Sequence, residues 1–240
     1  MNYQPAIHFN NVNFSANDHK ILKQVTGSFP EGSITTLVGP SGAGKTTLLK
    51  LCNGLLSADS GDIYIHGKPI DTYSPPVLRR LVGLALQSAP MIPGTVWENL
   101  ALPRTLKQEK LDQKEAQTAL NKVGLPEDLL KRNTKDLSGG QRQKVSIART
   151  LMNRPEILLL DEITSSLDQT SRQEIEDLIV KVNKNGTTIV WITHNLQQAL
   201  EIGTFTWVLM DGEIIETGDS ALLKSPTNER VQKFVKGEGK

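Results

Sequence analysis

The sequence predicts an α/β fold in which a mixed β-sheet is flanked by helices. Short and almost continuous apolar runs occur at 34–38, 81–86 and 157–160, and such runs are typical of strands that are buried on both faces of a sheet. A β-branched run at 187–193 predicts a further strand of the same kind. Apolar residues at helical spacing lie between these runs, and this alternation favours a sheet covered by helices.

Two further regions are expected beside this core. The segments 6–14 and 21–29 have strand patterns on either side of turn residues at 17–20, which predicts an antiparallel β region near the N-terminus. The stretch 106–135 is polar and helix-forming, which predicts an inserted α-helical lobe. The dipeptide Asp211-Gly212 between two apolar segments is a strong hairpin signal.

We expect all 240 residues to form a single domain. Its core, together with the antiparallel β region, comprises 1–86 and 154–220. The helical lobe comprises 88–153, and a C-terminal helix with a flexible tail comprises 221–240.

Composition narrows the class of protein. The hydrophobic content of 38% and the charged content of 22% are ordinary for a globular protein. The net charge of +1 leaves no electrostatic footprint for nucleic acid, which we therefore do not expect as a partner. Cys52 is the single cysteine, which suits a reducing compartment. The sequence shows no signal-peptide pattern and no apolar run near the roughly 20 residues of a membrane span, so a membrane role requires a partner.

The central motif follows the strand predicted at 34–38 and precedes a helical pattern. It consists of Gly39, Pro40, Ser41, Gly42, Ala43, Gly44, Lys45, Thr46 and Thr47. This stretch fits the pattern G-x-x-x-x-G-K-[ST], and a strand before it with a helix after it is the context that a phosphate-binding loop requires. The sequence therefore predicts a P-loop nucleotide-binding core.

The residue types in this loop explain how it would bind phosphate. Glycines permit backbone conformations that a β-carbon forbids, so successive N–H groups can converge on phosphate oxygens. The start of the following helix adds the positive end of its dipole. Lys45 provides a charge for the β- and γ-phosphates, and Thr46 provides a hydroxyl ligand for Mg²⁺.

Four polar residues lie at the ends of predicted strands. Asp161 ends the strand at 157–160 and can hold Mg²⁺. Glu162 follows it and can polarise a water molecule for attack on the γ-phosphate. Gln87 and His194 each come just after a strand, at the edge of an α/β sheet where ligands bind. Gln87 can bind Mg²⁺ or orient water, and His194 can hydrogen-bond a γ-phosphate oxygen.

A second anion-binding helix start is predicted at Ser138, Gly139, Gly140 and Gln141. A serine hydroxyl and free N–H groups stand there at the positive end of a helix dipole. Since one phosphate loop already serves the nucleotide, this second helix start suggests contact with a nucleotide from another direction.

Taken in order, 39–46, Gln87, 137–141, 157–162, 165–168 and His194 resemble the motifs of the ATP-binding subunits of ABC transporters. The resemblance covers nearly the whole chain, and the Leu-Ser-Gly-Gly-Gln run is its most specific part. It implies an ABC ATPase that forms a head-to-tail homodimer. Two ATP molecules then lie between the phosphate loop of one copy and the Leu-Ser-Gly-Gly-Gln run, the signature segment at 137–141, of the other.

The same resemblance implies a role for each site residue. Ser41, Lys45 and Thr46 would bind phosphate and Mg²⁺, while Gln87 and Asp161 complete the metal site. Glu162 would be the general base, and His194 would sense the γ-phosphate. Ser138 and Gly140 would reach the partner's ATP, and Asp168 would bridge the two sites.

One position departs from the family pattern. Family members place an aromatic residue on the adenine base, but Ala16 occupies the corresponding position here. Phe14 and His19 are the candidates to replace it.

The resemblance also implies a separate transmembrane permease, which docks beside Gln87 against 88–100 and the helical lobe. It places the chain in the cytoplasm, peripherally on the inner face of the cell membrane. The stretch 161–168 is similar to ATPases of iron or metal-ion efflux and of phosphate import, which leaves the cargo open.

The alternative is a soluble ABC ATPase that acts on ribosomes or DNA. Such proteins usually carry two fused nucleotide domains or a long coiled coil, and this sequence has neither. A non-hydrolysing regulator is disfavoured by Glu162.

Overall fold

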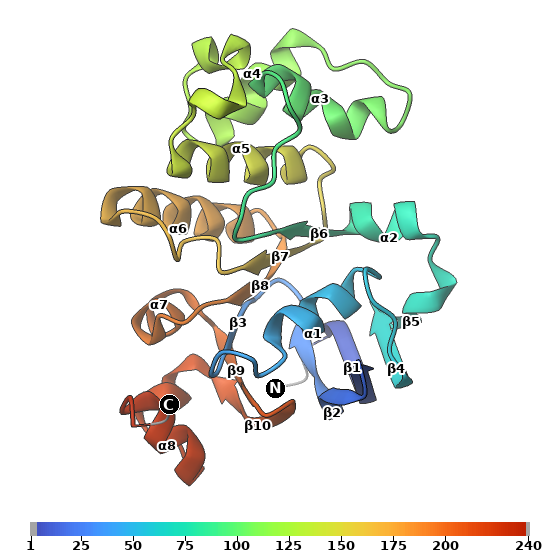
Figure 1. Cartoon of the computed structure of the whole chain (residues 1–240), viewed down its shortest axis with the longest axis vertical. Coiled ribbons are helices and arrows are strands. Elements are labelled where there is room, and N and C mark those ends of the chain that lie inside the picture. The colour runs from blue at the N-terminus through green and yellow to red at the C-terminus, as the bar shows by residue number, and fades with distance from the viewer. Residues whose placement is uncertain (1–3, 239–240) are drawn as a thin grey trace.

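The computed structural model describes residues 4–238 and contains two β-sheets (Figure 1). The larger sheet has six strands in the order β10-β9-β3-β8-β7-β6, and the smaller has four in the order β2-β1-β4-β5. The strands of the larger sheet are β3 (Ile34–Val38), β6 (Val82–Ala85), β7 (Ile157–Asp161), β8 (Thr188–Ile192), β9 (Phe205–Met210) and β10 (Glu213–Asp219). Those of the smaller sheet are β1 (Pro5–Ala16), β2 (His19–Pro30), β4 (Ser60–Ile65) and β5 (Lys68–Pro69).

The larger sheet is mixed, as the sequence predicts. Strands β6, β7, β8, β3 and β9 run parallel to their neighbours, and β10 pairs antiparallel with β9. Every residue of β3, β7 and β8 is buried, which explains their largely apolar character. The parallel strands therefore end at one common edge, where the loops that follow them meet.

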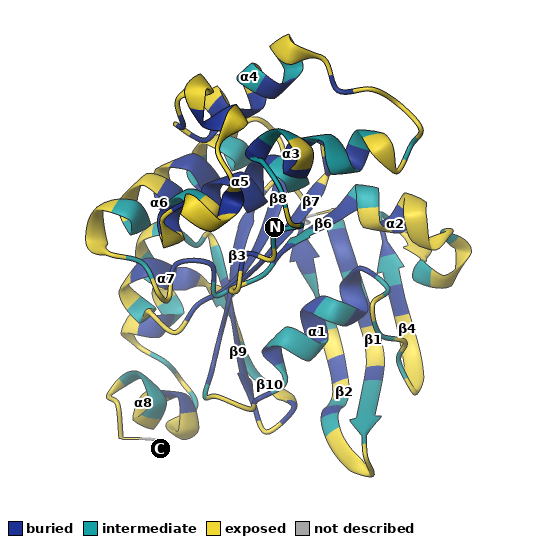
Figure 2. Cartoon of the chain, turned by 45° about the horizontal axis from the view of Figure 1, so that its top comes forward, coloured by how far each residue is buried: buried dark blue, intermediate teal, exposed yellow. Residues whose placement is uncertain are grey.

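The smaller sheet is antiparallel and covers α1 (Lys45–Cys52), which lies between it and the larger sheet (Figure 1). One continuous hydrophobic cluster joins both sheets and this helix. At its centre the ring of Trp207 lies 4.5 Å from that of Phe29 and 5.8 Å from that of Phe9. Figure 2 shows that burial ends towards the outer tip of the β1–β2 hairpin, where residues 17–20 are exposed.

The remaining helices either flank the larger sheet or build the helical lobe at the top of Figure 1. They are α2 (Pro75–Leu81), α3 (Val96–Thr105), α4 (Gln113–Lys122), α5 (Gly139–Leu151), α6 (Gln169–Lys184), α7 (Leu196–Ile202) and α8 (Glu229–Val235). Short 3₁₀ turns occupy Ile70–Thr72, Glu127–Lys131, Thr134–Asp136 and Ser220–Lys224. A second hydrophobic cluster runs from α3, α4 and α5 to α6 and the adjacent strands, so the helical lobe shares its core with the sheet.

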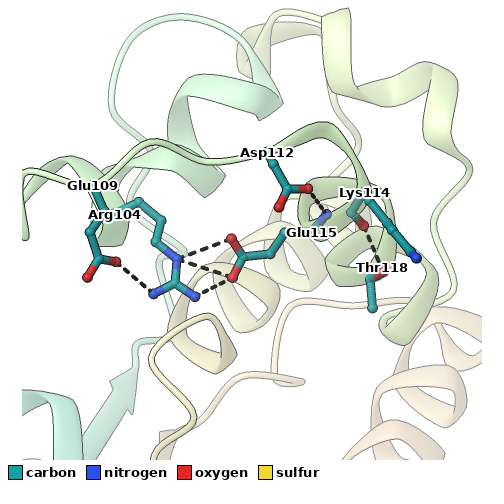
Figure 3. Close-up of polar contacts among 6 residues, drawn as sticks. All are labelled: Arg104, Glu109, Asp112, Lys114, Glu115 and Thr118. Atoms are coloured by element: carbon teal, nitrogen blue, oxygen red, sulfur yellow. Dashed lines mark hydrogen bonds and ion pairs between the residues drawn. The ribbon is translucent and has the colours of Figure 1, made fainter.

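The helical lobe is less regular than the sequence suggests. The stretch 106–135 is not one helical pattern, because α4 covers only Gln113–Lys122. Asp112 starts this helix, since its carboxylate accepts a hydrogen bond from the Glu115 N–H at 2.8 Å. The loop before it is held by Arg104, which pairs with Glu115 and with Glu109 (Figure 3). Leu111 is buried, although it precedes the helix.

Two other expectations need correction. The strand predicted at 81–86 is shorter, because Leu81 ends helix α2, whose N-terminal prolines stand at the first helical positions. The C-terminal segment is not one helix, because a 3₁₀ turn ends at Lys224 and α8 begins only at Glu229. Residues 239–240 of the predicted flexible tail lie outside the described residues.

Gly39 provides a test of how the phosphate loop is packed. It has φ 146°, and a β-carbon there would lie 1.9 Å from the Leu209 carbonyl oxygen. Gly42 also has positive φ, at 80°, but a β-carbon there would meet nothing within 4 Å. We predict that Gly39→Ala lowers the free energy of unfolding by about 3 kcal/mol and Gly42→Ala by about 1 kcal/mol.

Urea unfolding of the two variants measures this difference. Each variant carries the same chemical change on the same loop, so Gly42→Ala is the matched control. Equal losses of stability in the two variants would contradict the close approach of Gly39 to β9.

Candidate nucleotide-binding site

The phosphate loop connects β3 to α1 and leaves the start of this helix open. Gly39, Gly42 and Gly44 have φ values of 146°, 80° and 101°, a region that favours glycine. Gly44 is the N-cap of α1, no side chain caps the helix, and its first turn holds no acidic residue. The first N–H groups of a helix have no partner within it. The loop and helix start therefore form a site suited to an anion.

Lys45 lies across this loop. Its ammonium donates hydrogen bonds to the carbonyl oxygens of Gly39 and Pro40, both at 2.8 Å. The residue is 5% exposed. Burial lowers the pKa of its ammonium, and the nearby carboxylates of Glu162 and Asp161 act in the opposite direction. The charge is thus held over the loop by neutral oxygens, which phosphate oxygens can replace.

Thr46 and Asp161 meet beside the loop. The Thr46 hydroxyl donates to Asp161 Oδ1 at 3.1 Å, and Asp161, at the end of β7, is buried. Burial raises the pKa of its carboxyl group. A buried carboxylate next to a hydroxyl provides the hard oxygen ligands that Mg²⁺ prefers, and a cation there would offset the cost of the buried charge. These residues fit a Mg²⁺ ion.

Glu162 and His194 form a close pair at the neighbouring strand ends. His194 Nε2 lies 2.6 Å from Glu162 Oε1. The parallel register pairs Asp161 with Ile192, which places the residues just after β7 and β8 side by side. Glu162 has φ 50°, so the chain turns sharply at this residue. The pair positions a carboxylate one residue beyond the Mg²⁺ ligand candidate.

Gln87 lies at the same edge, where the sequence predicts a role in binding Mg²⁺ or in orienting water. Its amide donates to Ser165 Oγ at 2.9 Å, and the Ser165 hydroxyl donates to the Glu162 carbonyl oxygen at 2.9 Å. No hydrogen bond between Gln87 and Asp161 occurs in the described part of the chain. Ser165 is thus a site residue to which the sequence assigned no role of its own, because a serine in a short loop carries no specific signal.

The signature segment has its polar groups satisfied by each other. Ser138 Oγ accepts from the Gln141 N–H at 3.2 Å, and Gln141 Oε1 accepts from the Ser138 N–H at 3.0 Å, which is a capping box at the start of α5. A β-carbon on Gly140 would lie 2.7 Å from Ser171 Oγ, and one on Gly139 would lie 3.9 Å from Leu167. Within residues 4–238, no hydrogen bond or ion pair joins this segment to the phosphate loop.

Asp168 caps helix α6. Its carboxylate accepts a hydrogen bond from the Ser171 N–H at 2.9 Å, and this bond holds the pKa of Asp168 below its ordinary value. The structure therefore brings together the phosphate loop, Asp161, Glu162, His194 and Gln87, but leaves Ser138–Gln141 and Asp168 in contacts of their own.

The position expected for the adenine base is at the tip of the smaller sheet. Ala16 pairs with His19 across the end of the β1–β2 hairpin, and His19 is exposed. Phe14 packs against the hydrophobic cluster between the sheets. Of the two aromatic candidates, His19 is therefore the one whose ring is free to contact a base.

Residues 22–165 match the family described as ABC transporter, and they make up more than half of the chain. The chain belongs to the ABC transporter family. It is 43% identical over 239 residues to YjkB of Bacillus subtilis, which is named as an ABC transporter ATP-binding protein. The match covers 97% of this chain and 95% of that relative.

Two solved ABC structures are similar over most of their length. CbiO1 of Clostridium perfringens, part of the ABC transporter complex CbiONQ, superposes with a TM-score of 0.82 at 28% identity, covering 93% of this chain and 92% of that one. The ATP-binding cassette MJ0796, solved as a dimer with ADP and Pi, gives a TM-score of 0.79 at 30% identity, covering 89% and 98%.

The family establishes the activity. This chain is an ABC transporter ATP-binding subunit, an ATPase that uses ATP and Mg²⁺. None of its described helices has the length and apolar character needed to cross a membrane.

Proposed function

We propose that this ABC ATPase is the motor subunit of a transporter, in which two copies pair head to tail around two ATP molecules and drive a separate permease. The observation that carries the proposal is the placement of Thr46, Asp161, Glu162 and His194 at one sheet edge, beside the phosphate loop. This arrangement provides phosphate binding, a metal site and a base in reach of one another.

Binding of the nucleotide begins at the loop. The backbone N–H groups of 39–47, except at Pro40, which has none, and the Lys45 ammonium hold the β- and γ-phosphates, with help from the Ser41 hydroxyl. Thr46, Asp161 and Gln87 would hold a Mg²⁺ ion, which would supply positive charge to offset that of the phosphate oxygens. Lys45 exchanges the Gly39 and Pro40 carbonyls for phosphate oxygens, so its charge meets the ligand without a large movement.

Hydrolysis requires a base for the attacking water. Glu162 accepts the proton of this water at a carboxylate oxygen. His194 lies 2.6 Å from that carboxylate, so the imidazole holds Glu162 in place and, in the loaded site, reaches a γ-phosphate oxygen. Gln87 donates a hydrogen bond to Ser165, and as a metal ligand it would connect the nucleotide site to the loop that follows it.

The second half of each site comes from the partner copy. The capping box uses Ser138 Oγ and the Gln141 N–H, but the first N–H groups of a helix have no partner within it, so those of Gly139 and Gly140 can serve another molecule's phosphates. Ser138, Gly139, Gly140 and Gln141 then close on the γ-phosphate of the partner's ATP, and Asp168 lies between the two sites.

Asp161→Asn tests the metal assignment. Because burial raises the pKa of the Asp161 carboxyl, its charge disfavours the metal-free fold at neutral pH, and removing it will leave stability equal or higher. We expect MgATP binding to weaken roughly tenfold or more, since a charged Mg²⁺ ligand is lost. Isothermal titration calorimetry with ATP, once in Mg²⁺ and once in EDTA, measures the affinity for the nucleotide with and without the metal. ATP binding in EDTA is the internal control and will match the parent protein; an unchanged Mg²⁺ dependence would overturn the assignment.

The permease proposal is tested by capture from native membranes. The Glu162→Gln chain, tagged and held with MgATP, is isolated from gently solubilised membranes, with Lys45→Ala as the control that cannot hold ATP. We expect a polytopic membrane protein in stoichiometric amount, with the chain on the inner face of the cell membrane. Its sequence then identifies the cargo, for which a metal ion and phosphate are the candidates. Ribosomes or DNA complexes in place of a membrane protein would overturn the proposal.

A further inference from the structure

The loop 88–95, which follows Gln87, has almost no regular backbone structure of its own. It connects β6 to α3, and within it Ala89 has φ 43° and Gly94 has φ 125°. An irregular loop of this length ordinarily samples several conformations. Here the loop is held instead by hydrogen bonds from side chains of α3 and of the stretch 134–149, which contains the signature segment.

Arg149 of α5 is the central side chain. Its guanidinium donates to the Pro90 carbonyl oxygen at 2.6 Å and to Asn99 Oδ1 at 3.1 Å. Burial lowers its pKa. Across residues 4–238, no carboxylate forms an ion pair with it. A partly buried cation with only neutral partners is costly, and an apolar side chain would pack at lower cost. The arrangement therefore favours a role beyond packing.

Asn99 of α3 completes the attachment. It is fully buried. Its Oδ1 accepts from the Ile92 N–H at 3.0 Å as well as from Arg149, and its Nδ2 donates to the carbonyl oxygens of Ile92 and Thr95, both at 3.0 Å. Both donor and both acceptor positions of the amide are thus used. The loop is held in one conformation at its middle.

The chain just before the loop and the C-terminal end of the loop also bond to the stretch 134–149. Gln143 of α5 donates to the Leu86 carbonyl oxygen at 3.2 Å. The Gly94 carbonyl oxygen accepts from the Thr134 N–H at 2.9 Å and from the Thr134 hydroxyl at 3.1 Å. Thr134, Gln143 and Arg149 all lie within 134–149, the stretch that contains Ser138–Gln141.

We propose that Arg149, acting through Asn99, is a positioning residue that joins the loop 88–95 and the signature segment into one mechanical unit. A displacement of the loop then displaces Ser138–Gln141 with it, and a fixed loop holds the signature segment ready for the partner's ATP. The link to a permease rests on the proposed function. The coupling between the two segments lies within one copy of the chain and does not depend on a permease.

Arg149→Gln tests the coupling, with Arg142→Gln as the matched control, because Arg142 lies on the same helix and is exposed. Hydrogen exchange is read at the Ile92 and Thr134 amides, neither of which bonds to Arg149. We expect exchange at both amides to rise at least tenfold together in Arg149→Gln and to stay unchanged in the control. MgATP affinity will stay within twofold of the parent.

Dimerisation provides the functional readout. In a Glu162→Gln background, we expect Arg149→Gln to weaken ATP-dependent self-association about tenfold, because the signature segment must be ordered on closure. Arg149→Lys keeps the charge but not the two-pronged donor, so it will recover only part of the loss. The double variant Asn99→Ala with Arg149→Gln will weaken self-association about as much as either change alone, because both residues act through one contact.

Three results would overturn the inference. Exchange that rises at Ile92 but not at Thr134 means that Arg149 stabilises only the loop. Equal behaviour of Arg149→Gln and Arg142→Gln means that Arg149 has no positioning role. A loss of MgATP affinity together with a lower melting temperature in both Arg149→Gln and Arg149→Lys means general damage to the fold. If the parent does not self-associate with ATP, the proposed dimer fails, and the exchange comparison still decides the coupling.

Discussion

Replacing Glu162 with glutamine will lower ATP turnover by at least about 100-fold while ATP binding persists. A positioned general base typically contributes 10²–10⁴-fold to a reaction rate, and the amide of glutamine cannot accept the proton. Its oxygen can still hydrogen-bond His194, which lies 2.6 Å from the Glu162 carboxylate in the structure, so the site keeps its shape. Steady-state phosphate release measures turnover, and titration calorimetry measures the affinity for ATP.

Glu201→Gln is the control for this change. Glu201 is an exposed glutamate of α7, and its partner Gln197 can also hydrogen-bond a glutamine, so turnover will stay at the parent level. Full turnover in Glu162→Gln would sink the assignment of Glu162 as the base. Loss of binding and turnover together would show instead that Glu162 supports the nucleotide site itself.

Replacing Ser138 with arginine will also lower turnover by about 100-fold or more, but for a different reason. Ser138 stands at the N-cap of α5, where the proposed dimer brings the partner's γ-phosphate. A long side chain there prevents the two copies from closing, while the phosphate loop of each copy stays intact. ATP binding to the monomer will therefore persist, and ATP-dependent self-association, measured by analytical ultracentrifugation, will be lost.

Ser138→Asp separates this effect from damage to the helix. Aspartate keeps the N-cap, whose loss costs about 1 kcal/mol, but adds a negative charge opposite the phosphates. We expect it to abolish self-association as arginine does, with an unchanged melting temperature. Self-association that survives both substitutions would place the signature segment away from the nucleotide.

Much of the site could be predicted because its residues follow buried strands. An apolar run that ends in Asp161-Glu162 must bring its carboxylates to the edge where parallel strands end, and the same rule places Gln87 and His194 there. The phosphate loop carries its own signal in its glycines and Lys45.

The remaining details depend on contacts that no local pattern encodes. The pairing of Glu162 with His194 depends on the register between β7 and β8 and on the positive φ of Glu162. The contact of Arg149 with Asn99 joins residues 50 positions apart, and an arginine on a helix is ordinarily solvated. The break of the helical lobe at 106–112 follows from the Asp112 cap and the Arg104 ion pairs, which compete with a helical pattern of ordinary strength.

A mixing experiment tests the central claim most directly. Lys45→Ala has a damaged phosphate loop and an intact signature segment, and Ser138→Asp has the reverse. In the mixed dimer the aspartate faces a phosphate loop that holds no ATP, so it does not oppose closure. If each site is built from the phosphate loop of one copy and the signature segment of the other, the mixed dimer contains one intact site. We predict that equimolar mixing raises ATP turnover at least fivefold above either variant alone, with a maximum at equal amounts. Turnover that stays at the sum of the separate variants at every ratio would contradict the shared site.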